Sequence, residues 1–521
     1  MNKNNLPIYL ALAVIFGILI GAFFSTGKNG NFLLSKKSDE ELKMERLINY
    51  IEQDYVDHVD TDSLLNSAIT NILGKLDPHS IYIPKENLQA VTENMQGDFV
   101  GIGVQFKIVK DSITVMRPIE DGPSIKAGIK AGDRILIANN DTLYGKNYQS
   151  SDIFKFLKGK PDTKITLEVY RKSNDSLFTI DIKRQHINIK SVDVAYMVND
   201  SLGYIKIDRF ARNTYKEFKS SLDKLLVKGM KGLILDLRDN GGGFVDIANK
   251  IADEFLEDKK LIVSTKNNKG ITTKSYATEK GDFEKGNLYV LIDENTASAS
   301  EIVAGALQDN DKGIIIGRRS FGKGLVQEEM GLGDGSAIRL TIARYYTPTG
   351  RSIQKPYNPN NESSYKNDIF NRYKHGELFT KDSIKIVDSL QFKTPKGKIV
   401  YGGGGIIPDV FVPIDTTNYL PAYYYKEINN FAFQYVDTNR KKLATLTADE
   451  FINNPNKINE IVDIFLSKTK HFETNKKTKN LIKKYIKTIV ASELYNDEII
   501  YRVNQDDDKM IQKVLELESA N

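Results

Sequence analysis

Apolar residues along the chain change their spacing from region to region, and each spacing predicts a different kind of structure. An uncharged, mostly apolar run covers Leu6–Phe24. This length matches the hydrocarbon core of a bilayer, so we expect an uncleaved transmembrane signal anchor over residues 1–25. A cleaved signal peptide is the alternative. Residues 38–96 then carry apolar side chains at helical spacing, which predicts a helical N-terminal region.

Residues 97–186 have a different pattern: short segments in which apolar and polar residues alternate are separated by glycines and turn residues. The pattern predicts strands around a brief helix, and the succession resembles a PDZ domain. The carboxylate-binding loop of such a domain would fall on Gly101, Ile102, Gly103 and Val104. Successive N–H groups in a glycine turn bind anions, and the adjacent strand edge can add an extended peptide. A β-bulge marked by the two glycines remains the alternative.

Buried strands alternate with amphipathic helices over residues 187–415, which predicts an α/β core. The polar stretch 355–395 inside it is interpreted as a surface insertion. Residues 416–521 are rich in lysine and asparagine and have helical apolar spacing, so a separate helical C-terminal region is expected. The fold class is therefore multidomain, with α+β and α/β parts.

Composition limits the chemistry that this chain can perform. It has 521 residues and no cysteine, which excludes disulfides, thiolate metal sites and a cysteine nucleophile. Its five histidines are scattered without metal-binding spacing, so no metal and no cofactor are expected. The net charge of +5 is small and the charges are interspersed, so no nucleic-acid partner is expected.

Ser298 is the candidate nucleophile, because it lies between the apolar run 288–292 and a segment of helical character. A serine at a strand-to-helix turn has an exposed hydroxyl beside the positive end of a helix. Lys323 follows, and a desolvated lysine can activate a serine. Two simpler interpretations compete. Ser298 and Glu301 fit a helix capping box, and Lys323 between two glycines fits a solvated turn or an anion-binding loop.

Three glycines at 241–243 follow another apolar strand, where the backbone can approach a ligand and direct N–H groups at an anion. No dinucleotide or phosphate-loop motif is present, so these glycines can supply an oxyanion hole. The segment Asp77-Pro-His79-Ser80 contains the residue types of a catalytic triad. Residues this close in the chain converge only in an unusual turn, and aspartate before proline predicts an ordinary one.

Five segments, in this order, resemble the carboxyl-terminal processing (tail-specific) serine proteases over about residues 40–415. They are Gly97–Gly103, Asp236–Gly243, Thr296–Glu301, Phe321–Gln327 and Tyr346–Ile353. The resemblance implies a PDZ domain beside a crotonase-like β/α protease core, with boundaries near 97–186 and 187–415. It also implies cleavage of protein substrates near their C-termini.

The resemblance further implies that Ser298 is the nucleophile and Lys323 the general base, with Gln327 orienting the lysine. Ser300 is the rival nucleophile. For Lys323 to accept a proton near neutral pH, its pKa must fall from ~10.4 to about 7–8, which burial commonly achieves. The implied oxyanion and supporting groups are the Ala299 N–H, one N–H of the Gly242–Gly243 turn, and Glu301, whose role stays undefined.

The expected function is therefore that of a serine endopeptidase with a Ser-Lys dyad, anchored by its N-terminal helix with its catalytic part periplasmic or otherwise extracytoplasmic. Its partners would be protein or peptide substrates with free C-termini, held by the PDZ domain. A catalytically inactive, membrane-anchored PDZ scaffold is the main alternative, and the intact dyad with Gln327 argues against it. An acyl-CoA-type hydrolase or isomerase is a weaker alternative. The oligomeric state, a homo-oligomer included, stays open.

Overall fold

The computed structural model describes Val14, Phe16 and residues 38–358, 361–417, 419–469 and 475–520. The chain divides into two compact units, which meet between Ile72 and Leu73. Apart from two positions, the expected anchor at Leu6–Phe24 lies outside the described residues. In the part of the chain that the structure describes, no helix is both long enough and apolar enough to cross a bilayer.

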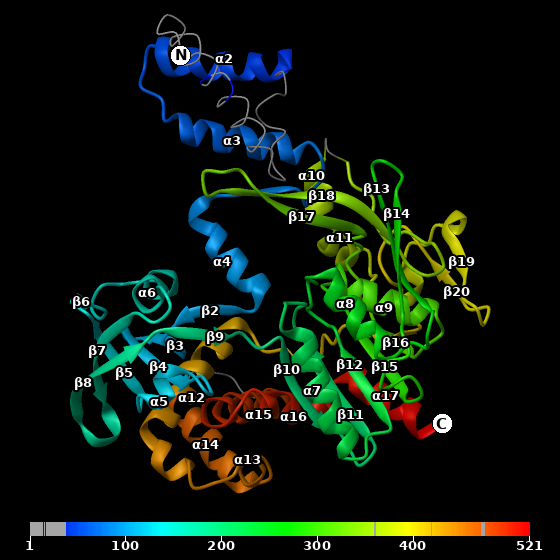
Figure 1. The fold of residues 1–521 in the computed structure, drawn as a ribbon. Coiled ribbons are helices and arrows are strands. Elements are labelled where there is room, and N and C mark those ends of the chain that lie inside the picture. The colour runs from blue at the N-terminus through cyan, green and yellow to red at the C-terminus, as the bar shows by residue number, and fades with distance from the viewer. Residues whose placement is uncertain are drawn as a thin grey trace, which may run out of the picture. The chain divides into compact units, whose positions relative to one another are not determined.

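The first unit contains helix α2 (Asp39–Asp54) and most of α3 (Thr61–Gly74) (Figure 1). Ser38 begins α2 with a reciprocal cap. Its hydroxyl accepts the Glu41 N–H at 3.2 Å, and the Glu41 carboxylate accepts the Ser38 N–H at 3.0 Å. This cap satisfies two backbone donors at the helix start. The prediction of helices in this region from its apolar spacing is confirmed by α2 and α3.

The second unit begins with strand β1 (Ile81–Ile83) and helix α4 (Lys85–Gln96), and then forms an antiparallel domain. Its sheet has the order β3-β4-β5-β7-β8, with β6 paired to β5. Strand β2 (Asp98–Gly101) pairs with β9 (Gln185–Asn188), so the two ends of this domain meet. The remaining elements are β3 (Val104–Val109), β4 (Ser112–Pro118), α5 (Pro123–Lys126), β5 (Asp133–Ala138), β6 (Asp141–Thr142), α6 (Ser150–Leu157), β7 (Lys164–Arg171) and β8 (Ser176–Lys183).

A six-stranded sheet of order β10-β11-β12-β15-β16-β21 forms the core of the chain. The pair β10·β11 is antiparallel, and all other neighbours are parallel. Every residue of β11 and β12 is buried, since helices cover both faces of the sheet. The bounds are β10 (Val192–Met197), β11 (Leu202–Ile207), α7 (Thr214–Val227), β12 (Gly232–Asp236), α8 (Val245–Asp253), β15 (Asn287–Ile292), α9 (Ala299–Asp309), β16 (Ile314–Gly317) and β21 (Val410–Phe411).

Alternate residues of each core strand enter two different apolar clusters. In β12, Leu233 and Leu235 pack in the cluster that contains α7, α8 and α9, whereas Ile234 faces the opposite side. Helix α9 is buried along its whole length, and a Cβ at Gly305 would lie 2.9 Å from the Thr347 side chain. The predicted succession of strands and helices is confirmed, and α9 begins directly after Ser298.

A second sheet contains the strand that follows Lys323 in the chain. It contains β1, β13 (Leu261–Asn267), β14 (Thr272–Tyr276), β17 (Leu325–Gly331) and β18 (Ala337–Tyr346). The long strand β18 pairs with β1, β13 and β17. Lys323 therefore lies in the loop just before β17, and Gln327 lies within that strand.

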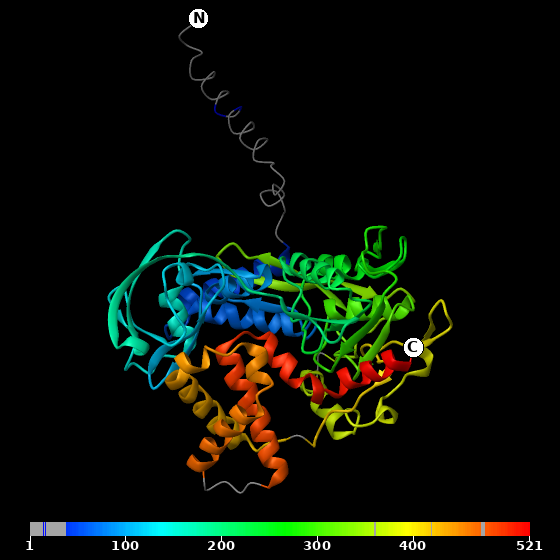
Figure 2. The ribbon, with the colours of Figure 1, turned by 90° about the horizontal axis from the view of Figure 1, so that it is seen from below.

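The C-terminal region is helical, as its spacing predicts, and most of it has a core of its own. Its last helix differs, because α17 packs against the core sheet through Met510, Ile511 and Val514. Figures 1 and 2 both place this red helix along the core strands. The prediction of a separate C-terminal region is therefore wrong for α17. The helices are α12 (Ala422–Leu443), α13 (Ala448–Ile452), α14 (Pro455–Lys468), α15 (Lys476–Leu494), α16 (Glu498–Asn504) and α17 (Lys509–Ala520).

Candidate active site

Ser298 lies at the turn between β15 and α9 with a positive φ of 57°. A non-glycine residue in this conformation is strained, and such strain concentrates at active sites. The turn before it is held by Asp293, whose carboxylate accepts the N–H of Thr296 at 3.0 Å. The Thr296 hydroxyl in turn donates to the Leu237 carbonyl at 2.9 Å. The strained serine is therefore fixed from both β12 and β15.

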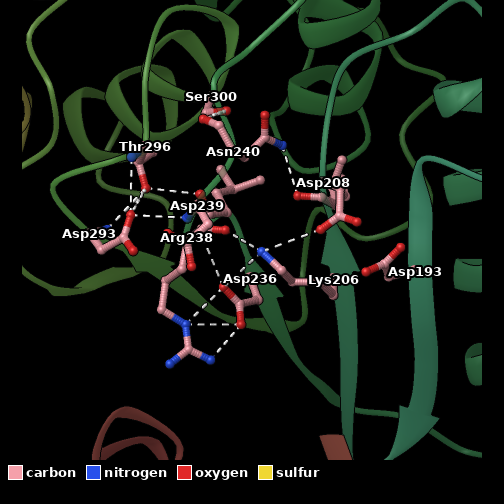
Figure 3. Close-up of polar contacts among 12 residues, drawn as sticks. Asp193, Lys206, Asp208, Asp236, Arg238, Asp239, Asn240, Asp293, Thr296 and Ser300 are labelled. Carbon is pink, nitrogen blue, oxygen red and sulfur yellow. Dashed lines mark hydrogen bonds and ion pairs between the residues drawn. The ribbon is translucent and has the colours of Figure 1, made fainter. Parts of the chain in front are cut away.

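The glycine loop after β12 packs directly against this serine turn. Asn240 holds the loop, because its carbonyl accepts the Ala297 N–H at 2.9 Å and its side chain donates to the Ile207 carbonyl at 2.8 Å (Figure 3). Gly242 has a φ of +98°, and a Cβ at this position would lie 2.8 Å from the Ser298 Cβ and 2.9 Å from the Ala299 nitrogen. Only glycine fits so close an approach.

The two serines of this turn differ in how far they are buried. Ser300 is completely buried, and its hydroxyl donates to the Asn240 carbonyl at 3.0 Å (Figure 3). Ser298 is only partly buried. A substrate can therefore approach Ser298, whereas Ser300 serves to hold the glycine loop.

Glu301, whose role the sequence left undefined, joins the serine turn to the lysine loop. Its buried carboxylate accepts the N–H of Ser298 at 2.9 Å and the N–H of Lys323 at 2.8 Å on one oxygen. The other oxygen accepts the Gly322 N–H at 2.7 Å and the Ser320 hydroxyl at 2.5 Å. The main-chain nitrogens of Ser298 and Lys323 are thus no farther apart than the sum of their hydrogen-bond lengths to this shared oxygen. The capping interpretation is confirmed, because Ser298 and Glu301 form a capping box at the start of α9.

Tyr345 of β18 reinforces this junction from the opposite side. Its buried hydroxyl lies 3.1 Å from the Ser298 carbonyl and 2.8 Å from the Lys323 carbonyl. Both segments are consequently held through their backbones, and their side chains remain available for chemistry.

The Lys323 amine donates to Gln327 Oε1 at 2.8 Å. Among the described residues it makes no hydrogen bond to the Ser298 hydroxyl. Burial, with Arg339 adding a like charge, lowers the pKa of Lys323 to about 8, although Glu301 and Asp77 oppose this shift. At pH 7 about a tenth of the amine is therefore unprotonated, and this fraction can act as a base.

The Asp77–Ser80 turn also contacts the site, although nothing in the local sequence of either segment indicates this contact. The Gln327 amide donates to the His79 carbonyl, which directs Oε1 toward Lys323. Asp77 fixes this turn by accepting the N–H groups of His79 at 2.8 Å and Ser80 at 2.9 Å. As expected, the three residues form no triad. The His79 ring contacts the Tyr365 hydroxyl at 2.7 Å, and burial lowers its pKa to about 4.

Residues 355–395 contain helices α10 (Glu362–Lys366) and α11 (Asp368–Lys374) and are not merely a surface insertion. The buried Arg372 donates to the carbonyls of Arg319, Ser320 and Phe321 at 2.8–3.2 Å. Most of this segment is exposed, as the interpretation of a surface insertion expects, but its buried part satisfies the backbone of the loop that leads to Lys323.

The four residues of the expected peptide loop connect β2 to β3, from the last residue of β2 to the first residue of β3. Ile102 is buried and its carbonyl accepts the Ser124 N–H at 3.0 Å, and Gly103 has a φ of +72°. Gly101 ends β2, and Val104 begins β3. Strand β3 is the last strand of its sheet, so its outer edge pairs with no strand of the described residues. An extended peptide can add to such an edge.

Three parts of the chain match known families. Residues 201–362 match peptidase family S41, residues 100–182 match the PDZ domain, and residues 422–496 match a family of unknown function. A carboxy-terminal-processing protease of Bartonella bacilliformis is 37% identical over 309 residues, covering 58% of this chain and 70% of that protein. A probable CtpA-like serine protease of Staphylococcus aureus (strain N315) is 35% identical over 315 residues, covering 60% and 62%.

Among solved structures, a photosystem II D1 C-terminal processing protease is 24% identical, covers 72% of this chain and 94% of that one, and has a TM-score of 0.38. The matched families define the class of this chain as a serine-type peptidase with a PDZ domain. More narrowly, it belongs to the carboxy-terminal-processing proteases of peptidase family S41. The PDZ match covers residues 100–182, the part of the chain that contains the expected peptide loop.

Proposed function

We propose that Ser298 attacks the scissile carbonyl and that Lys323 takes the serine proton. The observation that carries this assignment is the Glu301 carboxylate, which accepts the N–H groups of both residues on one oxygen. The nucleophile and its base therefore belong to one rigid junction, although they are 25 positions apart in the sequence.

The lysine must be neutral to act as the base. A neutral amine has one lone pair, and the hydrogen bond to Gln327 Oε1 leaves that lone pair free to accept the Ser298 proton. The protonated amine then returns the proton to the leaving amine, and a water molecule releases the acyl group from Ser298 by the same route. Gln327 orients the amine, and the His79 carbonyl orients Gln327.

The N–H groups of Ala299 and Gly243 are the proposed oxyanion donors. The Gly242 N–H already donates to the Asn240 side chain at 2.9 Å, which leaves Gly243 as the donor of that turn. Gly242 contacts Ala299 closely, so the two proposed donors lie on adjoining segments. One such donor contributes about 3–4 kcal/mol to the transition state.

The pH dependence of cleavage tests the role of Lys323. Because the neutral amine is the active form and its pKa is about 8, kcat/KM should rise as the pH is raised through about 8 and level off above it. The measurement is kcat/KM for a fluorogenic peptide with a free C-terminus, from pH 6 to pH 10.

Arg339→Gln is the matched variant for this profile. Arg339 lowers the pKa of Lys323, so its removal should move the rising limb to higher pH without abolishing activity. Glu328→Gln, an exposed change on the neighbouring strand β17, should leave the limb in place. A limb that stays fixed in Arg339→Gln would contradict the assignment of Lys323 as the titrating group.

We also propose that the Gly101–Val104 loop receives the terminal carboxylate of the substrate, while the β3 edge pairs with the tail. The left-handed backbone of Gly103 and the unpaired outer edge of β3 support this. A substrate with an amidated C-terminus should have a KM raised about tenfold, because the charge-assisted hydrogen bonds are lost. Equal cleavage of free and amidated substrates would exclude this tethering.

The uncharged run Leu6–Phe24 supports a transmembrane anchor with the catalytic part in the periplasm or another extracytoplasmic space. The full-length chain should therefore remain with the membrane fraction after a high-salt wash, and a chain that begins at Ser38 should not. Recovery of the full-length chain in the soluble fraction would exclude the anchor.

The parallel sheet with helices on both faces supports a crotonase-like assignment for the protease core.

A further inference from the structure

Helix α17 covers the face of the core sheet that the other core helices leave open. Met510, Ile511 and Val514 bury that face together with Tyr204 and Ile234. At the carboxyl end of β12, this apolar contact borders a group of charged residues. That end of β12 leads directly into the glycine loop, so the C-terminal region contacts the start of the loop that contains Gly243.

Arg238, the residue at the start of the glycine loop, is held from two sides. Its guanidinium donates through Nε to both oxygens of the buried Asp236 at 3.0 Å (Figure 3). Its Nη1 donates to Asp508 Oδ2 at 2.7 Å, and Asp508 stands immediately before α17. The Arg238 carbonyl accepts the Lys206 amine. The C-terminal region thus supplies one of the two carboxylates that hold this arginine.

The charges around Arg238 are closely coupled. Burial alone would raise the pKa of Asp236, but Arg238 and Lys206 lower it to about 2, so Asp236 stays ionised. Lys206 also lies 3.8 Å from Asp208, whose neighbour Asp193 comes from β10 (Figure 3). The Tyr501 hydroxyl of α16 donates to Asp193 at 3.1 Å, which is a second contact from the C-terminal region.

The segment between Arg238 and Gly243 is tied to its surroundings by hydrogen bonds at successive positions. The next residue, Asp239, donates its N–H to Asp293 at 3.0 Å, and Asn240 and Gly242 follow with the bonds described above. Only four residues separate Arg238 from Gly243. A shift of Arg238 therefore displaces the proposed oxyanion donor, and a misplacement of about 1 Å costs as much as 10²-fold in rate.

We propose that Asp508 is a positioning residue for the peptidase reaction: by holding the Arg238 guanidinium, the C-terminal region sets the glycine loop in its catalytic position. This inference rests on the proposed oxyanion hole at Gly243 and Ala299. It gives the C-terminal segment a role in transition-state stabilisation, in addition to its role in covering the sheet.

The test is the Asp508→Asn variant of the full chain. Asp508 Oδ1 also accepts the N–H groups of Met510 at 2.9 Å and Ile511 at 3.2 Å, and an asparagine retains this cap. The variant therefore removes the charge that faces Arg238 and preserves the start of α17. We expect kcat to fall about tenfold with KM unchanged, and the affinity for a peptide aldehyde, whose adduct with serine places an oxyanion in the hole, to fall by the same factor.

Glu516→Gln is the matched control, because Glu516 lies on the same helix in an exposed pair with Lys513. It should leave kcat and aldehyde affinity unchanged, and Asp508→Glu should recover part of the loss. If Asp508→Asn does not fold, Asp508→Ser retains a capping oxygen and carries the same expectation. A folded variant with wild-type kcat and aldehyde affinity would overturn the proposal. Failure of the oxyanion hole itself is separate, since the aldehyde would then not inhibit the wild-type enzyme.

Discussion

Ser298→Ala is expected to lower kcat/KM for an unstructured protein substrate by at least about 10³-fold, because no other hydroxyl can replace the nucleophile. Ser300→Ala should retain activity within a few-fold. It loses the hydrogen bond to the Asn240 carbonyl, which should lower the free energy of unfolding by about 1 kcal/mol. The measurements are cleavage of casein, followed by gel, and urea denaturation of both variants.

These two serines serve as each other's control, since they lie two positions apart on the same turn. A protein in which Ser300→Ala is inactive and Ser298→Ala is active would reverse the assignment. The buried position of Ser300 argues against that result, because a substrate carbonyl would have to displace the glycine loop to reach it.

Glu301→Gln is expected to lower the free energy of unfolding by roughly 3 kcal/mol, because all four of its partners are donors. They are the N–H groups of Ser298, Gly322 and Lys323 and the hydroxyl of Ser320. An ionised carboxylate accepts on both oxygens, whereas the amide of glutamine would turn an NH₂ group toward two donors. Urea denaturation at pH 7 measures the change.

The same variant should also lose most of its activity, because the serine turn and the lysine loop lose their common acceptor. Glu328→Gln, on the exposed side of β17, removes a carboxylate of the same size and should change neither property. Wild-type stability of Glu301→Gln would mean that the junction is held mainly by Tyr345 and Arg372.

The sequence predicts the core well because its strands are apolar throughout and have sharp ends. The apolar strand expected before the glycines at 241–243 becomes β12, and the amphipathic helix α7 precedes it. Ser298 and Lys323 were identifiable because a strand-to-helix turn and a glycine-flanked lysine are local patterns. The likeness to a protease family then joined them into one site.

Other features could not be predicted, because they depend on contacts between distant segments. The His79 carbonyl meets the Gln327 amide across 248 positions, and no spacing within either segment indicates the contact. The pairing of Arg372 with backbone carbonyls was hidden for another reason, because a polar stretch is equally typical of solvent exposure. Helix α17 has the same apolar periodicity whether it packs in a bundle or on a sheet.

The position of α17 also means that one face of the core sheet is covered late in the synthesis of the protein. Strands β11, β12 and β15 leave the ribosome long before the helix that covers their second face, so Tyr204, Ile234 and Leu291 initially lack a partner. Contacts across such a sequence separation form late, because a long loop must close first. Because Asp508 immediately precedes α17, the glycine loop receives its contact with Asp508 only after the C-terminal region has been translated.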